Sequence, residues 1–302
     1  MPINSLDFCS KLSGELDKAL VKSAVTGFMT DNIMRQKFIG AKTVLIPDLE
    51  MQGLGNYDRD SGFLKGSVTV DQKSYTLSKD RARTFTIDRE DMDETGVANL
   101  AGQIMGEFVR TKVVPEVDAY TISKICKEAT DNNQTVSLAS GETLAANCVK
   151  LLNRAINNIN QITGYEEEVI VFVNPTVYEA LMATSELSHQ LVVSDFEKGH
   201  ISTKVQKLNN AVIIPVPDAR MKTAYTFATT GAGGFEADND ADSIGLLALP
   251  KKAASLVKKT EKIRVFSPDQ NVEMDAYKFD YRIYYDAFVK SSLKNTIYAY
   301  VY

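Results

Sequence analysis

One glycine-rich stretch has the residue types of a phosphate-binding loop. Gly231, Gly233 and Gly234 approximate the glycine spacing of loops that bind dinucleotides. Glu236 stands where the last glycine of that pattern belongs, and no helical pattern follows it. Because the dinucleotide pyrophosphate binds at a helix N-terminus, we interpret residues 229–236 as a surface loop.

An acidic triplet follows this loop. Asp238, Asp240 and Asp242 match the first three ligand positions of a calcium-binding loop. The sixth position is Ser243 where glycine is required for the sharp turn, and the twelfth is Leu249 where a bidentate glutamate is required. We therefore predict no calcium site here.

The remaining reactive side chains are few. His189 and His200 are eleven residues apart and share no helical face, so we expect no metal site. Cys126 and Cys148 fall on apolar helical stripes and are expected to be small buried side chains. A cysteine paired in space with a distant histidine stays open, but no known catalytic motif occurs. We predict no enzyme activity, no cofactor and no metal.

The amino-acid composition narrows the class of protein further. The 302 residues include 34 Lys and Arg against 39 Asp and Glu, a net charge of −5, and 44% are apolar. This length suggests about two domains in a soluble protein, and the acidic balance disfavours a dedicated duplex-DNA binder. The three cysteines suggest a reducing compartment, and charges in residues 1–20 leave no export signal. Apolar runs are far shorter than the ~20 residues of a membrane-spanning helix.

The first ninety residues do not read as a compact domain. Residues 1–37 read as a partly helical arm, and residues 38–47 as a strand. In residues 48–87, alternating segments flank a glycine-rich turn and carry many charges, which indicates a two-stranded ribbon that is polar on both faces. An isolated ribbon is marginal in water, so this one must lie on another surface.

A long helix follows the ribbon. Val97, Leu100, Ile104 and Phe108 recur at helical spacing, and the pattern continues to residue 129. About 33 residues at 1.5 Å each give a helix of ~50 Å. Pro115 removes one hydrogen bond, so we expect an irregularity there.

The second half of the chain changes to an α/β pattern. We expect a helix over residues 144–159, a buried strand over 169–173, a helix capped by Asn174, and strands over 211–216, 224–228 and 244–249. Residues 263–266, 277–285 and 297–302 predict a three-stranded antiparallel sheet packed on the long helix. We interpret the basic residues between 251 and 264 as a solvated face; a patch for an acidic neighbour or packaged nucleic acid is the alternative.

This order of elements resembles the major capsid proteins of tailed bacteriophages, which have the Hong Kong 97-like fold. The resemblance runs from about Gly40 to Tyr302. It includes these stretches: Gly55-Asn-Tyr-Asp-Arg-Asp-Ser-Gly-Phe63, Asp80-Arg-Ala-Arg-Thr-Phe-Thr-Ile-Asp88, the helix stretch from Gly106 to Tyr120, Val216-Pro-Asp-Ala-Arg-Met-Lys222, and Tyr281-Arg-Ile-Tyr-Tyr-Asp-Ala-Phe288.

The resemblance implies an α+β fold with a defined division of the chain. Residues 1–37 would be the N-terminal arm, 38–47 the strand entering the E-loop, and 48–87 the E-loop itself. The peripheral domain would comprise the spine helix, residues 88–129, and the closing strands, residues 260–302. Residues 130–259 would form the inserted axial domain.

The function implied is self-assembly into an icosahedral shell around double-stranded DNA. The shell would form in the host cytoplasm and belong to the virion. The expected partners are copies of this chain in hexamers and pentamers, a separate scaffolding protein, portal and head-completion proteins, and DNA by non-specific proximity, with no membrane. The E-loop residues expected to contact a neighbouring subunit are Tyr57, Arg59, Phe63, Lys65, Lys73, Arg81 and Arg83. An encapsulin-like shell and a soluble α/β enzyme are the alternatives.

Overall fold

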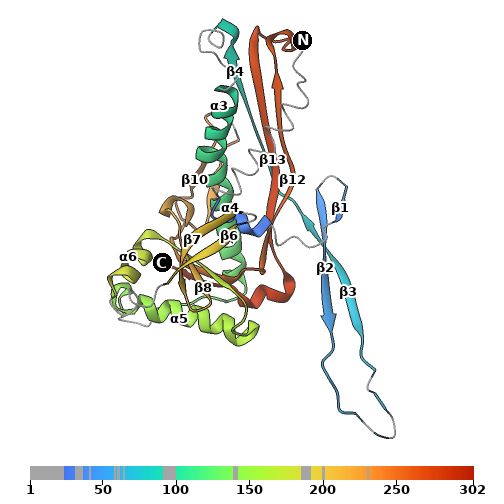
Figure 1. The fold of residues 1–302 in the computed structure, drawn as a ribbon, viewed down its shortest axis with the longest axis vertical. Coiled ribbons are helices and arrows are strands. Elements are labelled where there is room, and N and C mark those ends of the chain that lie inside the picture. Colours follow the sequence, from blue (N-terminus) through green and yellow to red (C-terminus); the bar gives the residue numbers. More distant parts are fainter. Residues whose placement is uncertain are drawn as a thin grey trace.

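A computed structural model places most of the chain. It describes residues 24–30, 37–40, 42–57, 59, 62–63, 65–90, 100–138, 142–184, 192–198, 201–229 and 231–302. The molecule is elongated, with a long sheet and helix at one end, an α/β region at the other, and a ribbon that projects to one side (Figure 1). The arm expected over residues 1–37 lies largely outside the described residues; within it, η1 (Gly27–Thr30) forms a short 3-10 turn.

The projecting ribbon is an antiparallel hairpin. Strand β2 (Thr43–Met51) pairs along its whole length with β3 (Val68–Thr76), from Thr43 opposite Thr76 to Met51 opposite Val68. A short strand, β1 (Lys37–Ile39), flanks β2 at the base. Residues 52–67 connect β2 to β3 at the far end, and we call β2, β3 and this tip the ribbon (Figure 1).

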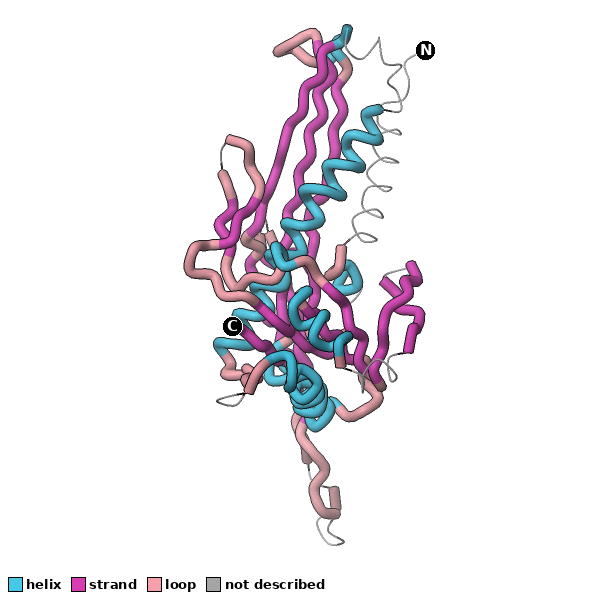
Figure 2. Tube along the Cα trace, turned by 90° about the vertical axis from the view of Figure 1, so that its left-hand side faces the viewer, coloured by secondary structure: helices cyan, strands magenta, loops and turns pink. Residues whose placement is uncertain are grey.

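A second antiparallel sheet lies along the long helix. Its strand order is β12 (Ala254–Phe266), β13 (Ala276–Val289) and β4 (Lys79–Asp88). We call it the helix-backed sheet, because its strands run beside the long helix (Figure 2). Phe279, Tyr281, Ile283 and Tyr285 alternate along β13 and are buried in the core that includes the helix. The predicted period-2 run is confirmed.

The long helix is continuous in direction but changes its hydrogen-bond pattern near Pro115. Segment α3 (Leu100–Phe108) leads into a π-helical turn, η2 (Val109–Val113), and then into α4 (Val114–Asp131). The Val114 amide donates to the carbonyl of Val109, five residues earlier. Pro115, which has no amide hydrogen, stands directly after this widened turn. The irregularity expected at Pro115 therefore takes the form of a π turn.

The α/β region is built on a six-stranded sheet. Its strand order is β14 (Tyr298–Val301), β11 (Ile244–Pro250), β5 (Val169–Val173), β8 (Ala211–Pro215), β7 (Ile201–Leu208) and β6 (Val192–Lys198). Helix α5 (Leu144–Thr163) packs against Val169, Val171 and Val173 of the central strand β5. Ile170 and Phe172 of the same strand belong to the core that includes α4. A layer on each face explains the uninterrupted apolar run of β5.

Helix α6 and a small hairpin complete this region. The Asn174 side chain accepts a hydrogen bond from the Val177 amide at 2.9 Å and so caps α6 (Pro175–Ala183), as its sequence predicts. Strands β9 (Tyr225–Phe227) and β10 (Phe235–Ala237) form a hairpin whose connection is the glycine-rich loop. Short 3-10 turns occur at η3 (Asp218–Arg220), before this hairpin, and at η4 (Pro268–Gln270) and η5 (Ser291–Thr296), after it.

Two expectations about strand partners were wrong. Residues 79–88 do not continue the ribbon, because β4 pairs with β13 over ten residues, from Asp88 opposite Ala276 to Lys79 opposite Tyr285. The C-terminal strand β14 does not join the sheet of β13; it pairs with β11 in the six-stranded sheet. Alternating residues predict a strand but do not identify its neighbour. No helix in the described part of the chain is long and apolar enough to span a membrane.

Candidate assembly surface

The ribbon exposes large apolar side chains at its tip, which the rest of the described chain leaves uncovered. Leu54 and Phe63 are almost fully exposed, at 106% and 86%, and Met51 and Tyr57 are more than half exposed. The rings of Tyr57 and Phe63 contact each other edge to face, with centroids 5.1 Å apart. Grouped exposed apolar side chains on an otherwise polar projection are typical of a surface that another chain covers.

The base of the ribbon is fixed by a small core. Val44 of β2 and Leu77, which follows β3, are buried with Val257, Tyr284 and Phe288 of the helix-backed sheet. The Tyr75 ring lies 4.8 Å from the Phe288 ring, measured between centroids, and its hydroxyl is 3.2 Å from that of Ser291. The ribbon is therefore anchored at its base, and the side chains at its tip are exposed.

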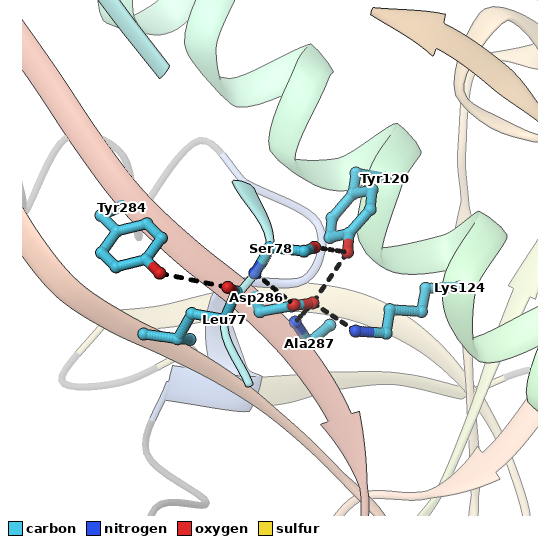
Figure 3. A network of polar contacts seen from close by, with 7 residues as sticks. All are labelled: Leu77, Ser78, Tyr120, Lys124, Tyr284, Asp286 and Ala287. Carbon is cyan, nitrogen blue, oxygen red and sulfur yellow. Dashed lines mark hydrogen bonds and ion pairs between the residues drawn. The ribbon is translucent and has the colours of Figure 1, made fainter. Parts of the chain in front are cut away.

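A buried carboxylate joins the ribbon base to the long helix (Figure 3). Asp286 of β13 has no exposed surface and accepts hydrogen bonds from the Ser78 amide at 2.9 Å and the Tyr120 hydroxyl at 2.8 Å. It also accepts from the Ala287 amide and forms an ion pair with Lys124. Charged acceptors make the stronger hydrogen bonds of folded proteins. This node fixes the chain at the point where it leaves the ribbon and enters β4.

Burial shifts the pKa values of two side chains near Asp286, those of Tyr120 and Lys79. Burial raises the pKa of the Tyr120 hydroxyl, so that it stays protonated and donates. The Lys79 ammonium stands over the Phe227 ring, 3.6 Å from its centroid, and burial lowers the pKa of Lys79. The first residues of β4 are thus bound to the helix and to the β9–β10 hairpin.

The structure divides the seven predicted contact residues into two groups. Tyr57, Arg59, Phe63 and Lys65 lie exposed at or near the ribbon tip, and Lys73 is half-buried on β3. Arg81 and Arg83 lie on β4, away from the ribbon. Their placement on the ribbon was wrong for the reason given above, that β4 pairs with β13.

Arg81 makes contacts within its own chain. Its guanidinium forms a two-point ion pair with Glu116 of α4, at 2.6 and 3.2 Å. The same group donates to the carbonyl oxygens of Ala228 and Gly234, at 2.7 and 3.1 Å. Arg81 therefore holds the glycine-rich loop against the long helix.

The glycine-rich loop is on the surface, as predicted. Gly231, Gly233 and Gly234 all have positive φ, a backbone conformation that favours glycine. Arg83 donates to the Gly231 carbonyl at 3.0 Å, and a Cβ added at Gly233 would lie 3.4 Å from the Arg83 guanidinium. The pattern signalled a loop correctly, but nothing in it indicated that two arginines of β4 bind it.

The other candidate side chains are two cysteines and two histidines. Cys126 and Cys148 are buried, as expected, and burial raises the pKa of the Cys126 thiol to about 12. His189 and His200 lie outside the described residues. Among residues that the structure describes, no cluster of three metal-binding side chains occurs. In the basic stretch, Lys251 pairs with Glu168 and Lys252 with Glu167.

Sequence reasoning missed the node around Asp286. The available signal was an acidic residue inside an apolar run, Asp286 followed by Ala287 and Phe288. Such a carboxylate is costly to bury without partners. Tyr120 and Lys124 could not be assigned as those partners, because they are more than 160 residues away in sequence.

Solved structures show which fold this is. The chain is similar to the capsid of cyanophage P-SCSP1u, with a TM-score of 0.58, 13% identity, and 89% of each chain covered. It is also similar to the mature capsid of bacteriophage PhiM1, with a TM-score of 0.56, 14% identity, and 86% of this chain and 82% of that one covered. A virus-like particle from Pyrococcus furiosus matches with a TM-score of 0.54, 12% identity, and coverage of 97% and 99%.

These comparisons confirm the expected fold. The chain has the Hong Kong 97-like fold, an α+β architecture with a projecting ribbon, a long helix backed by antiparallel strands, and an α/β region. No known family profile matches the sequence, and no curated protein matches it significantly.

Proposed function

We propose that this chain is the major capsid protein of a tailed bacteriophage, and that copies of it assemble into the virion shell. The proposal is carried by one observation: a ribbon with an exposed apolar tip is anchored to a fold that is shared with solved phage capsids. Such a ribbon becomes stable when another subunit covers it. Its function is contact rather than catalysis.

The ribbon corresponds to the E-loop and lies on the neighbouring subunit. One patch of each chain then meets a different patch of the next, which closes rings and finally a shell. Tyr57, Arg59, Phe63 and Lys65 are the contact residues at the tip, and Lys73 lies nearer the base. Each copy makes several such contacts, so weak contacts add up to a stable closed particle.

The division of the chain follows the same proposal. The long helix and the helix-backed sheet form the peripheral domain, and the six-stranded sheet forms the axial domain near the centre of each hexamer or pentamer. With these strand partners, β4 belongs to the peripheral domain and β14 to the axial domain. The net charge of −5 suits a shell that encloses DNA without gripping it.

Electron microscopy of the purified protein tests the function. We expect closed shells from the wild-type chain, and nuclease-protected double-stranded DNA in particles recovered from infected cells. Particles that contain a folded protein cargo instead of DNA would support an encapsulin-like shell. A chain that stays monomeric or forms only small oligomers under all conditions would refute a shell function.

Changes at the ribbon tip test the contact directly. Burying one phenylalanine side chain contributes about 2 kcal/mol, so Phe63→Ser weakens each contact roughly 30-fold. Because Phe63 is exposed in the single chain, the melting temperature of the unassembled subunit should not change. Phe63→Tyr keeps the ring and is the matched control, which should still assemble. Equal assembly by Phe63→Ser and wild type would contradict the role of the tip.

The other partners are a separate scaffolding protein, a portal and head-completion proteins. Expression of the chain alone then gives particles of varied diameter, whereas co-expression with the scaffolding protein gives one size. A uniform population of heads from the chain alone would contradict the need for a scaffold.

A further inference from the structure

A cavity of about 480 Å³ lies between the helix-backed sheet, the long helix and the glycine-rich loop. Arg81, Arg83 and Phe85 of the edge strand β4 line one wall, and Phe108, Lys112 and Glu116 line another. Residues 228, 229 and 231–234 of the glycine-rich loop cover it from the third side. The function proposed above uses neither this cavity nor the loop.

The cavity has more positive charge than the described residues of its own chain neutralise. Arg81 is paired with Glu116. Arg83 makes one hydrogen bond, to the Gly231 carbonyl, and forms no ion pair with a described residue. Lys112 is exposed and likewise forms no ion pair within the described part of the chain. Arg83 and Lys112 therefore line the cavity with no carboxylate partner among the residues that the structure describes, in a protein that is acidic overall.

A buried hydroxyl in the same wall also has no partner. Tyr285 is 1% exposed, lines the cavity, and its hydroxyl makes no hydrogen bond with any described residue. Buried polar atoms are almost always paired in native proteins, so an unpaired one marks a place where a partner is expected. This observation is independent of the two cations and indicates the same cavity.

The chemistry of the walls favours a carboxylate over a phosphate. The carbonyl oxygens of Ala228, Gly231 and Gly234 accept hydrogen bonds from the two arginines, so at these positions the loop presents acceptors to the cavity. A phosphate-binding loop presents backbone amides instead. The aromatic rings of Phe85 and Phe108, in contact at 4.8 Å between centroids, supply an apolar wall beside the cations. A peptide side chain with an apolar neighbour fits such a wall better than a free anion does.

We propose that this cavity is a docking site for an acidic segment of a second copy of this chain, with its carboxylate bound by Arg83 and Lys112 and a polar atom of the segment at Tyr285. The proposal rests on the assembly function above, because assembly brings a second acidic chain to every subunit. It identifies a contact separate from the ribbon tip, on the edge of the helix-backed sheet. The glycine-rich loop is then one wall of an interface.

Zero-length carbodiimide crosslinking tests this site, because it joins a lysine ammonium to a carboxylate in direct contact. Assembled particles are made from a mixture of isotopically heavy and normal chains and analysed by mass spectrometry. We expect Lys112 linked to an aspartate or glutamate in heavy–normal pairs, which arise only between chains. Links of Lys112 solely within one chain, or none while other lysines react, overturn the proposal.

Variants give a second readout. Lys112→Glu and Arg83→Glu should raise the concentration at which assembly begins at least tenfold, with unchanged melting of the unassembled chain. Tyr285→Phe keeps the ring and should raise the concentration at which assembly begins by a smaller factor, about threefold. Arg110→Glu is the matched control, because Arg110 is exposed, pairs with Glu107 and does not line the cavity. If Lys112→Glu and Arg110→Glu begin to assemble at the same concentration, the proposed docking site is wrong.

The two proposals fail in different ways. If the wild type forms shells but Lys112 shows no link between chains, the docking site is wrong and the shell function stands. If microscopy shows no shells, the proposed function is wrong. In that case, a Lys112 link between chains in smaller oligomers would still support the docking site, and its absence there would overturn it.

Discussion

Asp286→Asn should weaken the whole subunit by removing the charge at the ribbon base. The asparagine has the same shape, so its oxygen can still accept from Tyr120 and Ala287 at the position of Oδ1. Its amide nitrogen then takes the place of Oδ2 and faces the Ser78 amide, which is a donor too. The ion pair with Lys124 is lost at the same time.

The two losses set the size of the effect. The asparagine nitrogen would be buried at this position with a donor facing it, and a buried donor without an acceptor costs ~1–3 kcal/mol. The Lys124 side chain is 29% exposed, so water compensates part of its lost partner and we assign about 1 kcal/mol to that contact. The sum is about 3 kcal/mol, a large part of the ~5–15 kcal/mol by which folded domains are stable.

Urea unfolding of the unassembled subunit measures this change. Tyr120→Phe removes one hydrogen bond and should cost ~1 kcal/mol. Asp280→Asn is the control, since Asp280 lies on the same strand and its side chain accepts from the Thr84 hydroxyl near the surface. Asp286→Asn should also speed proteolysis of the ribbon. A loss below ~1 kcal/mol, or an equal loss in the control, would refute the role of this carboxylate.

Three further changes test other parts of the fold. Although burial raises the pKa of Glu168, hydrogen bonds from two lysines lower it below 4.5 overall. Its stabilisation is therefore present above pH 4.5 and is lost as the pH falls through the lowered pKa, so Glu168→Gln should flatten the acid side of a stability–pH curve. Cys126, with its raised pKa, should react with an alkylating reagent at about pH 8 only after unfolding; labelling of the native chain would contradict its burial. A Cβ at Gly245 would lie 2.6 Å from Tyr300, so Gly245→Ala should destabilise the subunit by ~1–3 kcal/mol, whereas Gly53→Ala, with no atom within 4 Å, should not.

The local elements were largely predictable because each depends on neighbours in sequence. The apolar run of β5, the Asn174 cap and the alternation along β13 each predict one element, and each is confirmed. The long helix was predicted from its periodicity, and Pro115 indicated where its hydrogen bonding changes. These patterns involve residues close together in sequence, and so do the interactions that form a helix turn or set the alternation of a strand.

The strand partners and the polar contacts were not predictable in this way. Residues 79–88 alternate as the ribbon does, so only the ten-residue pairing with β13 shows that they belong to the helix-backed sheet. Arg81 was expected on the ribbon, yet it lies on β4 and binds Glu116 and the glycine-rich loop of its own chain. Both partners are far away in sequence, and many other carboxylates could have taken the place of Glu116.

By itself the sequence determined the kind of each element, the polar character of the ribbon, and a resemblance to capsid proteins through the order of those elements. Only the tertiary structure decided where the ribbon ends, which sheet receives β4 and β14, and that Asp286 is buried beneath the ribbon base. The physical reason is that helices and strands follow from local periodicity. Strand pairing and buried charge depend on contacts between segments up to about 200 residues apart, and many such pairings compete until the core forms.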